Sequence, residues 1–236
     1  MSADSTSTPV LVPTGDGEMP AHLFVPATPG PAIVLLQEIF GVTAYIRSRA
    51  ADLAALGYTV VVPEVYWRLG DVTIDESSET AMEQAIAAMT RVDWPRAVAD
   101  AAAALRYARE LPGTGGRAGL LGFCFGGGLA FNAAAEERPA VLVSYYGSAL
   151  PTLLHLAGQV DAPALHHFGE ADDYIPMETV TRIRDAVSVH GDVEFHTYPG
   201  ANHAFDGPVP FLHHEDASQL AWTRTVEFLE RRLRRS

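Results

Sequence analysis

The stretch Gly122-Phe123-Cys124-Phe125-Gly126-Gly127-Gly128 holds the only cysteine of the chain and decides its fold. It lies between a short strand pattern that ends at Gly119–Gly122 and an alanine-rich helix pattern over Leu129–Glu137. The spacing G-x-C-x-G is that of a nucleophile elbow with sulfur in place of the usual serine oxygen. Such a turn strains the backbone, and the flanking glycines let strand and helix approach. We predict that Cys124 is a nucleophile; the alternative is a buried cysteine that packs as a small apolar side chain.

Two polar loops farther along the chain offer partners for a thiol, which at its ordinary pKa of about 8.5 is little ionised at pH 7. Asp172 follows the strand pattern that ends at Phe168, and His203 follows the one that ends at Tyr198. Nucleophile, acid and histidine therefore occur in the order that the α/β-hydrolase fold uses, each after a strand. Taken singly, Asp172 is equally typical of a turn or helix cap, and His203 of a loop.

Outward from these loops, strand and helix patterns alternate along the whole chain. A continuous apolar run such as AIVLLQ indicates a strand buried on both faces of a parallel sheet. We predict an α/β-hydrolase fold, with a mostly parallel central sheet flanked by helices on both faces. We expect one domain, residues 1–236, with 1–20 loosely ordered or peripheral. The expected strands are Ala32–Gln37, Tyr58–Val62, Val141–Tyr146, Ala164–Phe168 and Val193–Tyr198, and the expected helices include Ala44–Leu56, Ala81–Met89 and Trp94–Leu105.

Composition excludes several function classes. A single cysteine excludes internal disulfides, CxxC redox pairs and cysteine-rich zinc modules, and the absence of lysine excludes Schiff-base enzymes and Walker-type phosphate loops. The formal net charge of −13 disfavours nucleic acid and anionic membranes as partners. The first 15 residues lack the features of a signal peptide, and no run of 18 apolar residues occurs, so we expect a cytoplasmic protein. No metal site is predicted, because no histidine spacing suits one.

The quoted residues resemble the dienelactone hydrolase family of α/β-hydrolases over nearly the whole chain. The resemblance rests on six pieces: QEIFGV at Gln37–Val42, PEVYWR at Pro63–Arg68, the elbow, Tyr145-Tyr146-Gly147, the Asp172 loop and GANHAF at Gly200–Phe205. It implies an ester or lactone hydrolase of the carboxymethylenebutenolidase class that needs no cofactor. The expected partner is a small-molecule ester or lactone, and the expected state is a monomer or small homo-oligomer.

The resemblance also implies roles for individual residues. Cys124 is the nucleophile, His203 the general base and then acid, and Asp172, rather than the adjacent Asp173, orients His203. Glu38 contacts the resting thiol, and the amides of Ile39 and Phe125 form the oxyanion hole. Tyr145 lies in the substrate pocket. A buried carboxylate is costly without a task or partner, so Glu38 is independently notable; its alternative is an ion pair with Arg47 or Arg49.

The chain departs from the family where dienelactone-cleaving members hold the substrate carboxylate with two arginines. Those positions are Met82 and Gly207 here, and an aromatic partner becomes Ile86. Each lost charge-assisted hydrogen bond is worth about 1.5–3 kcal/mol, so we expect an altered substrate. Arg68 is the one nearby candidate to replace a missing arginine. Two other functions stay open: a thioesterase or acyl transferase with the same residues, and a noncatalytic small-ligand-binding protein.

Overall fold

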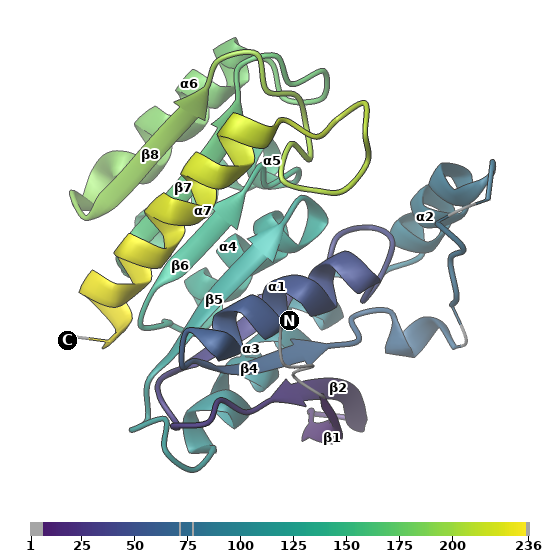
Figure 1. Ribbon diagram of the computed structural model, residues 1–236, viewed down its shortest axis with the longest axis vertical. Helices are drawn as coiled ribbons and strands as arrows, with labels where there is room; N and C mark the ends of the chain where they lie inside the picture. The colour runs from purple at the N-terminus through teal and green to yellow at the C-terminus, as the bar shows by residue number, and fades with distance from the viewer. Residues whose placement is uncertain (1–6, 71, 77, 235–236) are drawn as a thin grey trace. The chain divides into compact units, whose positions relative to one another are not determined.

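The computed structural model describes residues 7–70, 72–76 and 78–234. The chain divides into two compact units, Met1–Ala118 and Gly119–Ser236. The first unit begins with three consecutive strands, whereas strands and helices alternate through the second, as Figure 1 shows by colour along the chain. The expectation of one domain over residues 1–236 stays a prediction. Within the described part of the chain, no helix is both long and apolar enough to cross a membrane.

The first unit contains four strands in the order β1-β2-β4-β3. The pairs β1–β2 and β2–β4 are antiparallel, whereas β3–β4 is parallel. Every residue of β3 and β4 is buried, because α1 packs against β4 and α3 packs against both strands. The bounds are β1 Thr8–Pro13, β2 Glu18–Phe24, β3 Ala32–Leu36, α1 Ala44–Ala55, β4 Thr59–Pro63, η1 Trp67–Leu69, α2 Ala81–Thr90 and α3 Trp94–Glu110.

Residues 1–20 are expected to be loosely ordered or peripheral, and their described part is ordered but peripheral, since β1 is an edge strand of its sheet. Residues 8–13 form β1, which pairs with β2 over six residues. Pro9, Pro13 and Pro20 interrupt the strand pattern in the sequence and hid this hairpin. Pro9 and Pro13 fit here because β1 is an edge strand, and edge strands tolerate residues that cannot donate to a ladder. Residues 1–6 lie outside the described part.

The second unit contains four parallel strands in the order β5-β6-β7-β8. Helix α4 packs against β6 and α7 against β7, and Figure 1 shows α7 across the near face of these strands. Parallel strands bring their carboxyl ends to one edge, so the segments after β5, β7 and β8 meet there. The bounds are β5 Ala118–Phe123, α4 Phe125–Glu136, β6 Leu142–Tyr145, α5 Leu150–Leu153, η2 Leu154–Gln159, β7 Ala164–Gly169, α6 Met177–Val187, η3 Ser188–His190, β8 Val193–Tyr198, α7 Glu215–Leu229 and η4 Glu230–Arg234.

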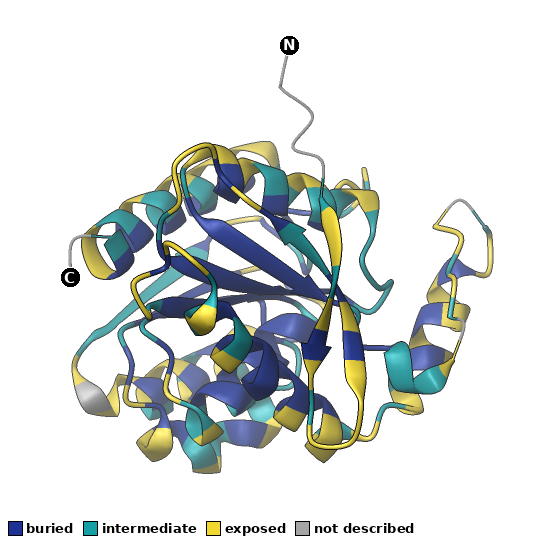
Figure 2. Ribbon diagram, turned by 90° about the horizontal axis from the view of Figure 1, so that it is seen from below, coloured by how far each residue is buried: buried dark blue, intermediate teal, exposed yellow. Residues whose placement is uncertain are grey.

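Helix starts are set by local side-chain chemistry. The Thr43 hydroxyl accepts from the Ile46 amide at the start of α1, and the Asp93 carboxylate accepts from the Arg96 amide at the start of α3. Predicted strands agree with the observed ones within two residues, while α4 begins at Phe125, four residues earlier than its alanine-rich pattern. Figure 2 shows the strands mostly buried and the outward helix faces exposed, as expected for an α/β protein.

Candidate active site

Cys124 lies at a strained turn between β5 and α4. Its φ of 51° and ψ of −113° fall where side chains are rarely tolerated. The flanking glycines have a direct steric reason, since a Cβ at Gly122 would collide with the Gly126 carbonyl. A Cβ at Gly127 would lie 2.8 Å from Ser144 Oγ. The spacing of the elbow is therefore required for α4 to start so close to the sheet.

Backbone hydrogen bonds hold this turn from two sides. The Cys124 amide donates to the Tyr145 carbonyl at the end of β6 (3.0 Å). The Cys124 carbonyl accepts from the amides of Gly127 (3.0 Å) and Ser148 (3.1 Å). The Cys124 residue is partly exposed. The nucleophile candidate thus lies on a rigid turn that is not fully buried.

His203 and Asp172 complete a continuous chain of contacts with the sulfur. His203 Nε2 lies 3.1 Å from Cys124 Sγ, and His203 Nδ1 lies 2.8 Å from Asp172 Oδ2. The second carboxylate oxygen, Oδ1, accepts from the amides of Tyr174 and Ile175, both at 2.8 Å. Asp172 therefore has both oxygens engaged and is fixed to its own loop while it orients the imidazole.

Burial and charge act in opposite directions on His203. Burial alone would lower its pKa, but hydrogen bonds to Asp172 and Cys124, together with the charges of those groups, raise the pKa to about 10. The His203 residue is 6% exposed and Asp172 likewise 6%. The imidazole of His203 is therefore protonated at neutral pH.

Asp173, the neighbouring carboxylate, has a different partner. Asn202 Nδ2 donates to Asp173 Oδ2 (2.7 Å), while Asn202 Oδ1 accepts from the amides of Asp173 (3.0 Å) and His203 (2.6 Å). This Asn202–Asp173 clamp ties the acid loop to the histidine loop. Asn202 belongs to the GANHAF motif, but sequence reasoning missed its role; the only signal there was an amide side chain directly before the histidine.

Exchanging the two clamp side chains, Asn202 and Asp173, is expected to restore the kcat/KM that Asn202→Asp alone lowers. Asn202→Asp places two carboxylates together and is expected to lower kcat/KM for an activated ester by about 10- to 100-fold. Asp173→Asn keeps an acceptor oxygen for Asn202 and should stay within about threefold of wild type. The double variant reverses one hydrogen bond and keeps the others, so its rate should return near the wild-type value. A double variant as slow as Asn202→Asp would contradict the clamp.

Two tyrosine rings flank His203, but Tyr145 is not one of them. Tyr145 is fully buried and its hydroxyl is hydrogen-bonded to Thr225 (2.7 Å), so it lies in the core and the prediction that it lines the pocket is wrong. The rings beside the imidazole are the buried Tyr146 and the exposed Tyr174, each 5.2 Å from it between ring centroids. The strand ends at Tyr145, and the positive φ of Tyr146 (37°) turns the chain there.

Glu38 and Ile39 follow β3 in the first unit. Glu38 is 8% exposed, and its backbone pairs with Gly41 in an isolated bridge. The Ile39 carbonyl accepts from the Tyr66 hydroxyl (2.8 Å), which fixes this turn. Arg47, one of the two arginines considered as a partner of Glu38, contacts His22 at 3.1 Å. The predicted roles of Glu38 and Ile39 remain predictions.

Arg68 is occupied by carboxylates, and its role as a substrate-binding cation stays a prediction. Its Nε and Nη2 donate to both oxygens of Asp100 (2.9 and 2.8 Å), and Nη2 also donates to Asp16 (2.6 Å). Asp100 is buried and also accepts from the Trp67 indole (2.9 Å). These carboxylates, above all Asp100, raise the pKa of Arg68. The sequence could not show this pair because its members are 32 positions apart.

Asp100→Asn is expected to destabilise the fold without affecting hydrolysis. It removes one side of a buried, bidentate ion pair, and urea unfolding should show a loss of about 1.5–3 kcal/mol. The rate per folded molecule should stay unchanged, because Arg68 serves the fold. Asp16→Asn, at the exposed end of the same arginine, is the matched control and should cost less. A selective rise in KM for carboxylate-bearing esters in Asp100→Asn would instead assign Arg68 to substrate.

The positions of the missing family arginines are apolar or lack a side chain. Met82 and Ile86 lie on α2 with 40% and 45% of their surface exposed. Gly207 follows His203 by four residues; its carbonyl accepts from His213 Nδ1 (3.0 Å). The next residue back, Asp206, is buried and accepts from the Ser218 hydroxyl (2.7 Å). None of these four positions supplies a cation.

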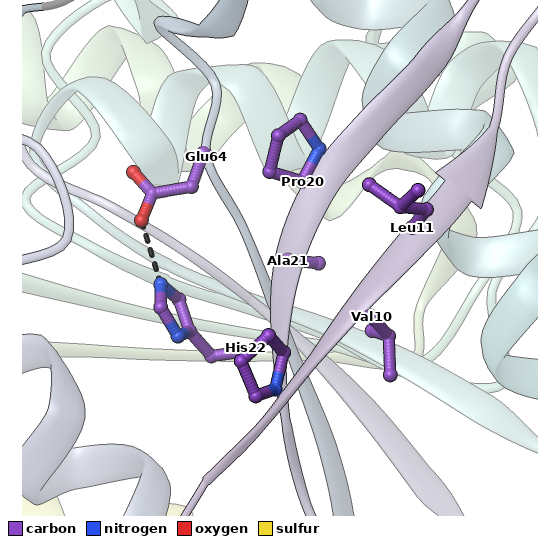
Figure 3. Close-up of a pocket in the computed structure, with 7 residues that line it drawn as sticks. Val10, Leu11, Pro20, Ala21, His22 and Glu64 are labelled. Carbon is purple, nitrogen blue, oxygen red and sulfur yellow. Dashed lines mark hydrogen bonds and ion pairs between the residues drawn. The ribbon is translucent and has the colours of Figure 1, made fainter.

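A surface hollow of about 400 Å³ lies on the β1–β2 hairpin, away from these residues in the sequence (Figure 3). One side carries His22 and Glu64, whose Nε2 and Oε1 are 2.6 Å apart. Its seven lining residues contain no nucleophilic side chain. They are Pro9, Val10, Leu11, Pro20, Ala21, His22 and Glu64.

Two adjacent histidines of β7 are buried in the core. His167 is hydrogen-bonded to Tyr198 (2.8 Å) and Thr225 (3.0 Å), whereas His166 packs between the rings of Phe131 and Phe195. Burial lowers the pKa of both, that of His166 to about 4. Both are neutral core residues at physiological pH. Among the described residues, no group of three or more potential ligands could hold a metal ion.

Comparisons with known proteins agree on one family. The sequence model of the dienelactone hydrolase family matches residues 19–233. The chain is 33% identical over 215 residues to carboxymethylenebutenolidase 1 of Cupriavidus pinatubonensis, covering 90% of this chain and 92% of that one. It is 36% identical over 202 residues to the carboxymethylenebutenolidase of Pseudomonas putida, covering 85% and 86%.

A solved structure extends this similarity to the fold. A crystal structure from Klebsiella pneumoniae, provisionally described as a dienelactone hydrolase, has a TM-score of 0.82 and 28% identity, covering 94% of this chain and 97% of that one. The predicted α/β-hydrolase fold is thereby confirmed.

Proposed function

The chain belongs to the dienelactone hydrolase family and is an ester or lactone hydrolase. We propose that it works through a Cys124–His203–Asp172 triad and an acyl-enzyme. The observation that carries the proposal is the unbroken contact chain from Sγ to Nε2 and from Nδ1 to Asp172 Oδ2, at 3.1 and 2.8 Å. Each member has the atom that its role requires directed at its neighbour.

The reaction begins with the Cys124 thiolate. Its sulfur attacks the carbonyl carbon and forms a C–S bond, and the carbonyl oxygen becomes an oxyanion. The Phe125 amide at the N-terminus of α4 would donate to that oxyanion, as would the Ile39 amide that the family resemblance assigns. The C–O bond then breaks, and the leaving oxygen takes the proton from His203 Nε2.

Water completes the cycle. Neutral His203 removes a proton from water, and the resulting hydroxide attacks the thioester carbonyl. The C–S bond breaks and releases the product as a carboxylic acid, which gives its proton to solvent, and the thiolate–imidazolium pair is restored. Asp172 holds Nδ1–H throughout, so Nε2 always faces the reacting atoms. In the family resemblance Glu38 assists thiolate formation before substrate binds, and we include it in the proposal in that role.

The substrate we propose is an ester or lactone without a carboxylate beside the reacting carbonyl. This rests on Met82 and Gly207 at the positions of the two family arginines, and on Arg68 being held by Asp100. A substrate carboxylate would lose two charge-assisted contacts of about 1.5–3 kcal/mol each. Neutral substrates lose nothing by this change.

Intact-mass trapping of the acyl-enzyme tests the function directly. A short pulse with a neutral activated ester, quenched in acid, should leave the mass of one acyl group on Cys124. Parallel pulses with a matched carboxylate-bearing lactone and a thioester compare the substrate classes. Acyl transfer to another residue would overturn the triad, and a strong preference for the carboxylate-bearing lactone would overturn the substrate proposal. Fastest turnover of the thioester would favour a thioesterase instead.

A further inference from the structure

An exposed aromatic ring stands beside the base of the proposed triad. Tyr174 is 69% exposed, although the next residue, Ile175, is buried. Its ring centroid lies 5.2 Å from that of His203, with the planes at 68°. Its amide donates to Asp172 Oδ1 (2.8 Å), the same carboxylate whose other oxygen holds His203. The backbone under this ring is therefore fixed by the triad itself, while the ring surface remains open.

The position of the ring relates it to one part of the substrate. In the proposed reaction the leaving oxygen takes its proton from His203 Nε2, so it must come within hydrogen-bond distance of that atom. The substituent on this oxygen continues outward from His203. Two tyrosine rings lie at this distance from the imidazole: Tyr146, also 5.2 Å away, is fully buried, whereas Tyr174 is exposed. Of the two, Tyr174 is the ring that a group leaving past the imidazole can reach.

We propose that Tyr174 is a specificity-determining residue that binds the alcohol part of the substrate and favours flat, unsaturated leaving groups such as phenols and enols. This inference rests on the proposed function. An exposed aromatic face gains from contact with another ring both through buried apolar area and through ring–ring geometry. A saturated alcohol of equal acidity buries part of this apolar area but has no ring to make the ring–ring contact.

Two acetates separate this contact from chemistry. Phenyl acetate and a fluorinated alkyl acetate, chosen so that the two alcohols have about the same acidity, share one acyl group and so form the same acyl-enzyme. We expect Tyr174→Ala to lower the ratio of their kcat/KM values by about 10-fold, mainly through KM of the phenyl ester. Tyr174→Phe keeps the ring and should hold the ratio within about twofold of wild type. Leu220→Ala, on α7 and 45% exposed, is the control for loss of an exposed apolar side chain.

The ratio decides the outcome whatever happens to the absolute rates. If Tyr174 only shields the Asp172–His203 hydrogen bond, Tyr174→Ala lowers both rates equally and the unchanged ratio overturns the proposal. An unchanged ratio with unchanged rates overturns it as well. Failure of the proposed function is measured separately with Cys124→Ala. If the function is wrong, Cys124→Ala still hydrolyses phenyl acetate, both with Tyr174 and with Ala at position 174.

Discussion

Cys124→Ala is expected to reduce ester turnover by about four orders of magnitude or more, to the background that binding and the oxyanion donors alone provide. The sulfur is the atom of residue 124 that is hydrogen-bonded to His203, at 3.1 Å. Without the sulfur, His203 has no nucleophile to activate. No thioester then forms, so water has no acyl-enzyme to attack. Steady-state hydrolysis of a short activated ester measures the loss.

The variant should fold as the wild type does. Alanine already adopts a positive φ in this chain, since Ala204 has a φ of 55° against 51° for Cys124. Cys124 is partly exposed, so the shorter alanine side chain leaves no fully buried cavity behind. Matching thermal unfolding of the two proteins is therefore the control. A variant that keeps a tenth or more of the wild-type rate, in the same fold, contradicts a thiol nucleophile.

The parts of the site that could be predicted from the sequence all depend on order along the chain. Cys124, Asp172 and His203 each come directly after a strand, and parallel strands bring the loops at their carboxyl ends to one edge of the sheet. The register of β5 to β8 accounts for their meeting, since β5–β6, β6–β7 and β7–β8 are all parallel. Apolar periodicity was sufficient to predict those strands, and glycine spacing was sufficient to predict the elbow.

The parts that could not be predicted depend on contacts between distant side chains or on local turns. Arg68 near a polar segment is typical of a binding cation, until the fold places the buried Asp100 against it. Tyr145 and Tyr146 are equivalent in the sequence, and the turn after β6 decides that the second one meets His203. Two neighbouring carboxylates after β7 differ only in their partners, His203 for Asp172 and Asn202 for Asp173.

Two non-glycine residues besides Cys124 have a positive φ among the residues that the structure describes. They are Tyr146 and Ala204, with φ of 37° and 55°. One lies after β6 and contacts the His203 ring, and the other is the residue directly after His203. Strained backbone persists only where surrounding contacts enforce it, and it concentrates at functional sites. The three positions therefore mark the same edge of the second unit as the triad does, by an observation independent of the side-chain contacts.

Asp172→Asn is the second substitution with a large expected effect, and it tests the ionisation of the site. The side-chain amide can keep the contacts of Oδ1 to the Tyr174 and Ile175 amides, so the loop should stay in place. Its NH₂ group then faces His203 Nδ1 and favours the tautomer with the proton on Nε2. That nitrogen can no longer take up a proton readily, and kcat should fall by about 10³- to 10⁴-fold.

The same variant should also shift the alkaline limb of the pH–rate profile, and the direction of that shift follows from the pKa of His203. His203 must be protonated to supply the leaving oxygen, so the wild-type rate of acylation should fall as the pH rises through the His203 pKa of about 10. The hydrogen bond that His203 donates to Asp172 is the largest of the causes that raise this pKa, and its loss moves the alkaline limb to lower pH. Asp173→Asn, one residue away, should leave the limb unchanged. The alkaline limb reports the titration of the thiolate–imidazolium pair of Cys124 and His203. If the limb stays in place in Asp172→Asn, a group other than His203 donates the proton.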